Sequence, residues 1–378
     1  MSKPGVYIAL RRKKEMVMTD SALEIRNIVA RAVVAPISRP IRTAVGVIPA
    51  APLVLLDVHT EQGISGHAYL FAYTPVILLP LVNLVKELGE LLKGKAVVPF
   101  DRMKELDLHF RLLGTQGLLG MVLSGLDMAF WDILGKAAGR PVVGLLGGQP
   151  KPLRAYDSYG FIDVKTDAAH IERSLEQGFK AIKIKVGVGS LAQDIESVSV
   201  VRQIIGPDIA LMLDFNQSMQ PAQAIYRIAE LSRFDPYWIE EPVSAQDLQG
   251  HAAVRESVTV PVQTGENWWF PRDMQRAISA RASDFVMVDI MKIGGVTGWM
   301  AAAAQADAAS LPLSSHIFIE ASAHMLAITP TCDWLEYLDF AGAILEEPYT
   351  VAGGTVCARG PGLGISWDEP AIARYAVQ

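Results

Sequence analysis

Phe179-Lys-Ala-Ile-Lys183-Ile-Lys185-Val-Gly187 is an apolar run that carries lysines at the alternate positions 183 and 185. In a β-strand, residues two positions apart point to the same side, so Lys183 and Lys185 project together. Two ammonium groups on so apolar a strand repel each other and resist leaving water. The rest of the chain must therefore supply either anions or a route to solvent.

Strands and helices alternate around this run, from residue 151 onward. Candidate strands occupy residues 154–157, 181–186, 210–214, 237–240, 260–265, 285–289, 312–316 and 334–338, and helical stretches such as 221–233 and 298–309 follow most of them. This repetition over roughly 200 residues predicts an α/β fold of the (β/α)8 type. An open doubly wound sheet is the alternative, although no Gly-x-Gly-x-x-Gly turn supports it.

The part of the chain before the barrel has a different rhythm. Residues 23–75 indicate an antiparallel meander, with loose alternation from Ile25 to Val34, a break at Pro40 and a strand from Pro52 to Val58. Residues 75–139 then take a helical period. Strands followed by helices predict a self-contained α+β domain over residues 23–150. Residues 1–22 are expected to be a disordered extension.

Composition narrows the class of protein. With 378 residues, 51% of them hydrophobic, the chain can bury more than one core. The net charge of -6 gives no basic surface for nucleic acid, so a small-molecule partner is expected. No run approaches the roughly 18 apolar residues of a membrane span. Cys332 and Cys357 are expected as reduced thiols in a cytoplasmic protein.

Nearly every candidate strand of the barrel ends in an ionisable residue. The set comprises Lys183, Lys185, Asp214, Glu240, Glu266, Asp289, His316 and Glu336. Taken singly, an acid after a strand often caps the next helix, and a lone histidine is more often structural than catalytic. In a barrel of this kind, however, the carboxyl ends of the strands meet at one mouth, where active sites form. The complete set therefore predicts one site that also supplies the anions facing the lysines.

The residue types in this set point to a metal and to proton abstraction. Asp214, Glu240 and Glu266 lie on consecutive strands and need a cation to offset their repulsion. All-oxygen ligands favour Mg²⁺, with Mn²⁺ as the alternative. Mutual repulsion between Lys183 and Lys185, together with the cation, is expected to lower the pKa of a lysine base.

The opposite side of the expected site carries a second base. His316 can be that base, with Asp289 orienting its ring. A protonated Glu336 can donate a hydrogen bond to a developing oxyanion.

These motifs resemble the enolase superfamily and, within it, the mandelate racemase subgroup. The resemblance runs from about residue 23 to the C-terminus. Its most specific pieces are Lys183-Ile-Lys185, Asp214-Phe-Asn216, Trp238-Ile-Glu-Glu-Pro242, Gly265-Glu266-Asn267, Asp289 with Lys292-Ile-Gly-Gly-Val-Thr297, and Ser314-Ser-His316. Sites of this superfamily use a Lys or His base with Mg²⁺.

The resemblance implies a role for each site residue. Asp214, Glu240 and Glu266 would bind Mg²⁺, Lys185 would be the base for the S-enantiomer with Lys183 tuning it, and Glu336 would be the electrophile. His316 paired with Asp289 would act on the R-enantiomer. Ser158 and Asn216 match positions that line the site.

The resemblance also implies the architecture: a (β/α)7β-type TIM barrel over residues 151–345 with an α+β N-terminal capping domain over 23–150. A C-terminal segment, 346–378, would return to the cap. A homo-oligomer, as large as an octamer, is expected for this subgroup.

The loops of the cap decide the substrate. Ile41, Val45, Ile48, Phe71 and Tyr73 are expected to form an apolar lid for an aryl or bulky apolar group, or else to belong to the core of the cap. Tyr159 stands where the subgroup's namesake has a histidine, and it too is expected to contact substrate. This departure leaves the substrate open.

Two activities and one non-catalytic alternative remain open. The first is racemisation of mandelate or a related aryl hydroxy acid through an enediolate. The second is dehydration of an acid sugar to a 2-keto acid by β-elimination. The third is a barrel retained only for binding, against which the complete set of ligands and bases argues.

Overall fold

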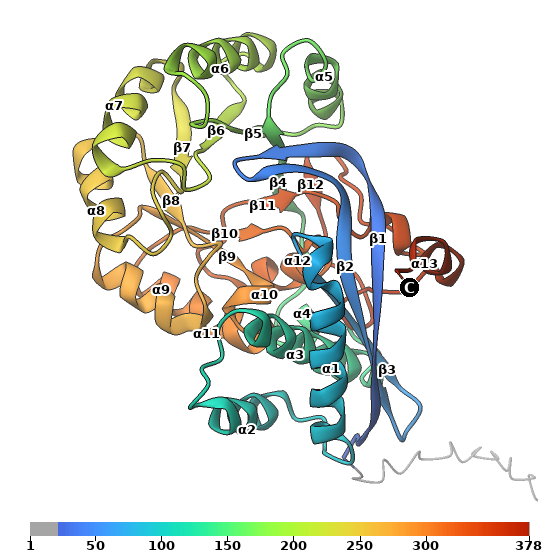
Figure 1. Cartoon of the computed structure of the whole chain (residues 1–378). Helices are drawn as coiled ribbons and strands as arrows, with labels where there is room; N and C mark the ends of the chain where they lie inside the picture. The colour runs from blue at the N-terminus through green and yellow to red at the C-terminus, as the bar shows by residue number, and fades with distance from the viewer. Residues whose placement is uncertain (1–21, 378) are drawn as a thin grey trace, which may run out of the picture.

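The chain, as described by a computed structural model covering residues 22–377, begins with a three-stranded antiparallel sheet (Figure 1). Its strands are β1 (Ile25–Thr43), β2 (Gly46–Thr60) and β3 (Ser65–Phe71), in the order β1-β2-β3. A short 3₁₀ turn, η1 (Pro75–Ile77), leads into α1 (Leu78–Leu92), α2 (Pro99–Phe110), α3 (Leu118–Ala137) and α4 (Val142–Leu145). The expectation for residues 1–22 falls, apart from Ala22, outside the described residues.

The predicted break at Pro40 is wrong, because β1 continues through it to Thr43. The ladder between β1 and β2 is irregular between Pro36 and Ile41 and then resumes. Because β1 lies at the edge of its sheet, with β2 as its neighbouring strand, a proline at position 40 costs no ladder hydrogen bond to a second strand of the sheet. The result is a long hairpin whose turn, at Ala44 and Val45, lies well away from the sheet that it starts from.

The second unit is a parallel barrel, as predicted. Its strands are β4 (Leu153–Phe161), β5 (Ala181–Lys185), β6 (Ala210–Asp214), β7 (Pro236–Glu240), β8 (Val262–Thr264), β9 (Phe285–Asp289), β10 (Leu313–His316) and β11 (Leu335–Tyr337). They follow the order β10-β9-β8-β7-β6-β5-β4-β11. The N–H of Ser315 donates to the carbonyl of Trp334 at 3.0 Å, which joins the two end strands and nearly closes the ring. The barrel with an N-terminal cap is confirmed.

Helices connect successive strands of the barrel and form its outer layer (Figure 1). They are α5 (Ala168–Glu176), α6 (Leu191–Ile205), α7 (Pro221–Leu231), α8 (Leu248–Ser257), α9 (Phe270–Ser279), α10 (Ile290–Ile293), α11 (Gly295–Ala308) and α12 (Ile319–Ile328). Short 3₁₀ turns lie at η2 (Ser232–Phe234) and η3 (Gly342–Ile344). Ser190 begins α6 with a capping box to Gln193, so the sequence after β5 specifies where this helix starts.

One helix of the described residues, α3, is long and apolar enough to cross a membrane, so the expectation that no run approaches that length is wrong for this helix. It is a core helix by position, because 83% of its most apolar window is buried inside the fold. Asp127 and Asp132 lie within α3. A helix that is apolar on every side is typical of a core helix surrounded by protein.

The end of the chain contacts the sheet of the cap. β12 (Thr355–Val356) pairs with β4, and α13 (Glu369–Tyr375) follows. The indole N–H of Trp367 donates to Asp57 on β2 at 2.7 Å, and the N–H of Val377 donates to the carbonyl of Ala32 on β1 at 2.9 Å. These contacts support the proposed C-terminal segment 346–378, whose boundaries stay a proposal with those at 23–150 and 151–345.

Candidate active site

A cavity of about 530 Å³ lies between the carboxyl ends of the barrel strands and the β1–β2 hairpin. Most residues singled out from the sequence line it: Ile41, Val45, Ile48, Phe71, Tyr73, Ser158, Tyr159, Lys183, Lys185, Asn216, Glu266, His316 and Glu336. Asp214, Glu240 and Asp289 lie behind this lining, each as the last residue of its strand. The structure thus brings the predicted residues to one mouth.

Strand register explains why residues so far apart in sequence converge. Lys185 pairs in register with Asp214, and Asp214 pairs with Glu240 on the next strand. Farther around the ring, Asp289 is in register with His316. Since each of these residues ends its strand, their side chains start from the same level of the barrel.

The two lysines each face carboxylates. Lys183, only 1% exposed, donates to Glu240 Oε1 at 2.7 Å and lies 2.8 Å from Glu336 Oε1. Lys185 pairs with Asp214. The sequence argument that these ammonium groups need anions is confirmed.

The side chains alone do not lower the lysine pKa values; the expected lowering also depends on the cation and stays a prediction. Burial lowers the pKa of Lys185, and Lys183 lowers it further, but the Asp214 and Glu266 carboxylates together outweigh both, so the pKa lies above its usual value. Burial likewise opposes the charge of Lys183, yet Glu240 and Glu336 raise its pKa well above the usual range. The sequence argument combined the neighbouring ammonium with a bound cation, and it did not weigh the carboxylates in register against them.

His316 and Asp289 form the predicted pair. His316 Nδ1 lies 2.7 Å from Asp289 Oδ2, which leaves Nε2 directed at Glu266 Oε2, 3.3 Å away. Asp289 also accepts from the N–H groups of Met291 and Lys292, so its carboxylate is fixed at the start of α10. Burial lowers the pKa of His316, but Glu266 and Asp289 outweigh it and raise the pKa to about 9.

Glu336 is held as a carboxylate rather than as the expected protonated acid. Burial raises its pKa, but Lys183 and His316 outweigh burial and lower the pKa to about 2. Its Oε2 accepts from the N–H of Ile317 at 3.0 Å, and Ser158 donates to it as well. These neighbours favour the ionised form of Glu336 in this arrangement.

The three predicted ligand carboxylates form a buried acidic set. Asp214 is 1%, Glu240 0% and Glu266 8% exposed. Burial raises the pKa of Glu240 to about 8, against Lys183, and the charges of Asp214 and Glu266 add to the rise. Among residues 22–377, no three acidic or imidazole side chains already surround a common point, because Lys183, Lys185 and His316 each hold one of these carboxylates.

This donor set fits a hard divalent cation. It offers only carboxylate oxygens, the ligands that Mg²⁺ and Mn²⁺ prefer. Mutual repulsion among buried carboxylates is the charge problem that such a cation relieves. Gln263 donates from Nε2 to Glu240 Oε2 at 3.2 Å and so fixes the orientation of one of the three.

The cap side of the cavity is apolar and partly aromatic. Phe71 stacks on Phe340 with ring centroids 4.3 Å apart, and Tyr73 lies 4.6 Å from Phe71. Phe71 is also fully buried, so both alternatives given for it, lid and core, describe it. Val45, at the hairpin turn, is 97% exposed.

Two barrel residues connect the site to the hairpin. Asn216, with φ of 49°, accepts from the N–H of Ala44 at 3.3 Å. Tyr159 lies under the guanidinium of Arg39, 3.8 Å from ring centroid to Cζ, and its hydroxyl shares a hydrogen bond with Ser174. The Tyr159 hydroxyl is thus already engaged with α5, although the residue lines the cavity.

Sequence reasoning missed several residues of this cavity. Thr43, Gln217 and Asn267 add polar groups to its wall, and Phe340 adds an aromatic ring. Asn267 directly follows Glu266, so its position next to a predicted ligand could have identified it. Phe340 comes after the last barrel strand, and no local pattern marks it.

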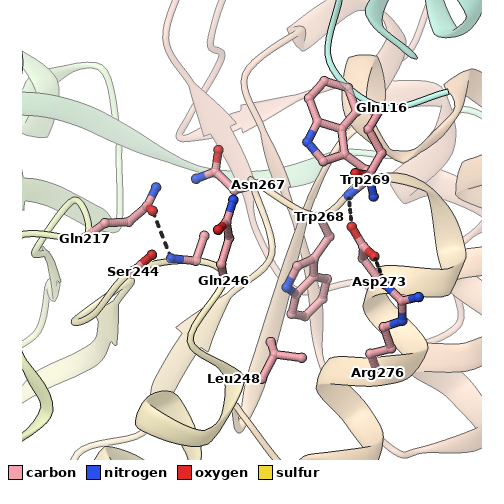
Figure 2. Close-up of a pocket in the computed structure, with 11 residues that line it drawn as sticks. Gln116, Gln217, Ser244, Gln246, Leu248, Asn267, Trp268, Trp269, Asp273 and Arg276 are labelled. Carbon is pink, nitrogen blue, oxygen red and sulfur yellow. Dashed lines mark hydrogen bonds and ion pairs between the residues drawn. The ribbon is translucent and has the colours of Figure 1, made fainter. Parts of the chain in front are cut away.

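A second cavity, also about 530 Å³, opens between the loops that follow β7 and β8 (Figure 2). It shares Gln217 and Asn267 with the first, and the rest of its lining includes Gln116, Ser244, Gln246, Trp268, Trp269, Asp273 and Arg276. Gln217 accepts from the N–H of Ala245 at 2.8 Å. None of the predicted bases lines this cavity, so the chemistry belongs to the first.

The fold and this acid, lysine and histidine set define a barrel enzyme of the enolase superfamily. Its N-terminal part, residues 25–147, matches the family model of the mandelate racemase / muconate lactonizing enzyme N-terminal domain, and residues 166–371 match the enolase C-terminal domain-like model. The chain belongs to the mandelate racemase and muconate lactonizing enzyme family.

Solved structures of relatives share the fold and hold magnesium. An enolase from Bradyrhizobium complexed with magnesium and mandelic acid is 58% identical, with a TM-score of 0.93 over 95% of this chain and 100% of that one. An enolase from alpha proteobacterium BAL199 with bound magnesium is 38% identical, with a TM-score of 0.91 over 94% of this chain and 100% of that one. Mg²⁺ is therefore the cofactor of this family of structures.

Curated relatives have diverse activities. L-talarate/galactarate dehydratase of Salmonella typhimurium is 31% identical over 68% of this chain, and the match spans 66% of that protein. The 3,6-anhydro-alpha-L-galactonate cycloisomerase of Streptomyces coelicolor is 30% identical over 86% of this chain and 91% of that one. Others are epimerases and racemases, so family membership leaves open the choice between isomerase and hydro-lyase.

Proposed function

We propose that the protein removes the α-proton of an α-hydroxy carboxylate and returns a proton to the same carbon, racemising mandelate or a related aryl hydroxy acid through an enediolate. The observation that carries this proposal is that Lys185 and His316 line one cavity with an aromatic wall formed by Phe71 and Phe340. The similarity to a structure complexed with magnesium and mandelic acid supports the aryl substrate.

Each base has a proposed role set by its surroundings. Lys185 takes the proton of the S-enantiomer, and His316, oriented by Asp289, takes that of the R-enantiomer. Lys183 helps to neutralise the substrate carboxylate. A base must first lose its own proton, so Lys185 can act only once Asp214 no longer holds its charge.

Glu336, Ser158 and Asn216 are proposed to contact the substrate carboxylate and hydroxyl, and Tyr159 contacts the aryl group with Ile41, Val45, Ile48, Phe71 and Tyr73. Since Glu336 is ionised in this arrangement, its part as a hydrogen-bond donor requires it to take up a proton when substrate binds.

Asp214, Glu240 and Glu266 are the proposed ligands of Mg²⁺, with Mn²⁺ as the alternative ion. When bound, the cation neutralises these carboxylates and stabilises negative charge on the substrate carboxylate. The contribution of the chain is to bury the three ligands at adjacent strand ends and to keep bulk water from them.

The test is α-proton exchange in D₂O. Purified protein with Mg²⁺ should exchange the α-proton of both enantiomers of mandelate, followed by NMR, while polarimetry follows loss of optical rotation. If neither enantiomer exchanges, mandelate is not the substrate.

Acid-sugar dehydration is the second candidate. It is favoured by the similarity to L-talarate/galactarate dehydratase and by polar groups in the cavity wall, Thr43 and Asn267 among them. It needs the same first step, followed by loss of a β-hydroxyl. Release of a 2-keto acid from a sugar acid, without racemisation of mandelate, would place this activity first.

We further propose a cytoplasmic homo-oligomer, as large as an octamer, acting on a small hydroxy acid. The described cysteines, Cys332 and Cys357, are both free, which supports a reducing compartment. Large apolar side chains on and after α2, namely Phe100, Leu108, Leu112 and Leu113, are exposed and support a subunit contact.

A further inference from the structure

A buried lysine outside the set of predicted bases lies between the lid and the acidic ligands. Lys292, on α10, is 6% exposed. Its Nζ donates to Asn267 Oδ1 at 2.7 Å. On its other side the ammonium lies 5.0 Å from the ring centroid of Tyr73 and shares a hydrogen bond with the Tyr73 hydroxyl. One cation therefore contacts both the lid and the residue next to Glu266.

Asn267 carries this contact on to two carboxylates. Its Nδ2 lies 2.9 Å from both carboxylate oxygens of Glu241 and 3.2 Å from Glu266 Oε1. Lysine only donates and a carboxylate only accepts, so one amide orientation satisfies all three partners. An aspartate here would add a third negative charge, and a leucine would leave buried charges unpaired.

Glu241 gives this chain of contacts its link to the metal ligands. It is 1% exposed and directly follows Glu240. Its φ of 41° is a conformation that non-glycine residues rarely adopt. Its N–H donates to the carbonyl of Gln263 at 3.0 Å, and its carbonyl accepts from the N–H of Gln217 at 2.8 Å. A side chain held by Asn267 helps to maintain this backbone, on which the position of Glu240 depends.

We propose that Lys292 and Asn267 are positioning residues that hold Glu266 and Glu241 for magnesium binding and fasten Tyr73 of the lid above them. This inference rests on the proposed assignment of Glu240 and Glu266 as magnesium ligands. It does not depend on which acid is the substrate.

The test measures Mn²⁺ affinity of the whole enzyme by electron paramagnetic resonance of the free ion. Lys292→Met and Asn267→Leu should each weaken Mn²⁺ binding by about 10- to 100-fold, as loss of a partner of a metal ligand generally does. The double variant should bind Mn²⁺ about as weakly as the weaker single variant, because both changes break one chain of contacts. The substrate KM should rise in Lys292→Met and in Tyr73→Leu alike, because both changes break the contact between Lys292 and the lid.

Lys136→Met is the matched control, because Lys136 pairs with Asp132 in the cap, where none of the proposed ligands lies. It should keep wild-type Mn²⁺ affinity. If Lys292→Met does not fold by circular dichroism, Lys292→Gln replaces it, with weakening in the same direction expected. Wild-type Mn²⁺ affinity in folded Lys292 and Asn267 variants would overturn the inference. Weakened affinity without any mandelate exchange would uphold it while removing the proposed substrate.

Discussion

Lys185 and His316 approach the cavity from β5 and β10, strands that are not neighbours in the barrel. Each base forms an ion pair with a carboxylate on the neighbouring strand: Lys185 with Asp214, and His316 with Asp289. Because the two bases have different partners, either can be removed while the other keeps its surroundings. Their roles are therefore separable at the level of single residues.

Lys185→Ala should abolish α-proton exchange of (S)-mandelate and leave measurable exchange of the R-enantiomer, because a positioned base contributes about 10²- to 10⁴-fold. His316→Asn should show the reverse pattern. Proton NMR in D₂O measures both, with Mn²⁺ binding as the control for an intact site. Loss of both exchanges in either folded variant that still binds the metal ion would contradict the two-base proposal.

At the scale of elements, a buried acid on α3 anchors the start of α11. Asp127 accepts from the N–H of Thr297 at 2.9 Å and from its hydroxyl at 2.6 Å. This carboxyl therefore links a helix of the cap to a helix of the barrel. Burial raises the pKa of Asp127 to about 7, although the donors from Thr297 and Val296 oppose the rise.

This anchor should make stability depend on pH. The pKa of the Asp127 carboxyl is about 3.9 in the unfolded chain. Between about pH 4 and 7 the folded state binds the extra proton, so the free energy of unfolding falls as pH rises, by up to about 1.4 kcal/mol per pH unit. Asp127→Asn should remove this contribution. In urea denaturation, the free energy of unfolding of the variant minus that of the wild type should increase by about 1 to 3 kcal/mol between pH 5 and pH 7.5. A difference that stays constant with pH would refute it.

At the scale of the whole molecule, barrel and cap enclose the proposed ligands together. The acidic set lies at the carboxyl ends of the strands, and the hairpin covers that mouth, with the Ala44 N–H bonded to Asn216. A cation that binds only the folded chain stabilises every part that must be in place to form the site.

Magnesium should therefore raise the midpoint of thermal unfolding. Free Mg²⁺ at 100 times its Kd contributes about 2.7 kcal/mol relative to chelated protein. Chelator should also abolish activity, and added Mg²⁺ or Mn²⁺ should restore it. Differential scanning fluorimetry measures the shift, which Glu240→Gln should lose. If Mg²⁺ does not change the midpoint of the wild type, Asp214, Glu240 and Glu266 do not form its binding site.

Assembly is the second property at this scale. Leu112 is 95% and Leu113 77% exposed, on the turn after α2, and such side chains are favoured in subunit contacts. Replacing both with Asp should shift the protein toward smaller species in light scattering coupled to gel filtration, with the fold retained. Val188→Asp, at another exposed apolar position, should leave the mass unchanged. If the double variant keeps the oligomeric mass of the wild type, the subunit contact does not involve Leu112 and Leu113.

Much of this architecture could be predicted from the sequence, for a physical reason. Strands such as Ala210–Asp214 repeat with helical intervals and end in a charged residue, so periodicity and these strand-end residues together predict the mouth of the barrel. The continuation of β1 through Pro40 could not be predicted, because it depends on β1 lying at a sheet edge. The raised pKa of Lys185 could not be predicted for a similar reason, because its cause is a carboxylate on the neighbouring strand. Phe340 joined the aromatic wall only through folding.

The hairpin turn has a consequence for how such an enzyme changes over evolutionary time. Val45 is almost completely exposed and lines the candidate active-site cavity, yet it belongs to the hairpin turn of the cap and not to the barrel strands. Surface positions tolerate substitution with little loss of stability. A lineage, or a directed-evolution library, can therefore try new turn residues, and with them new side groups on the acid, while the strands that carry the bases stay the same.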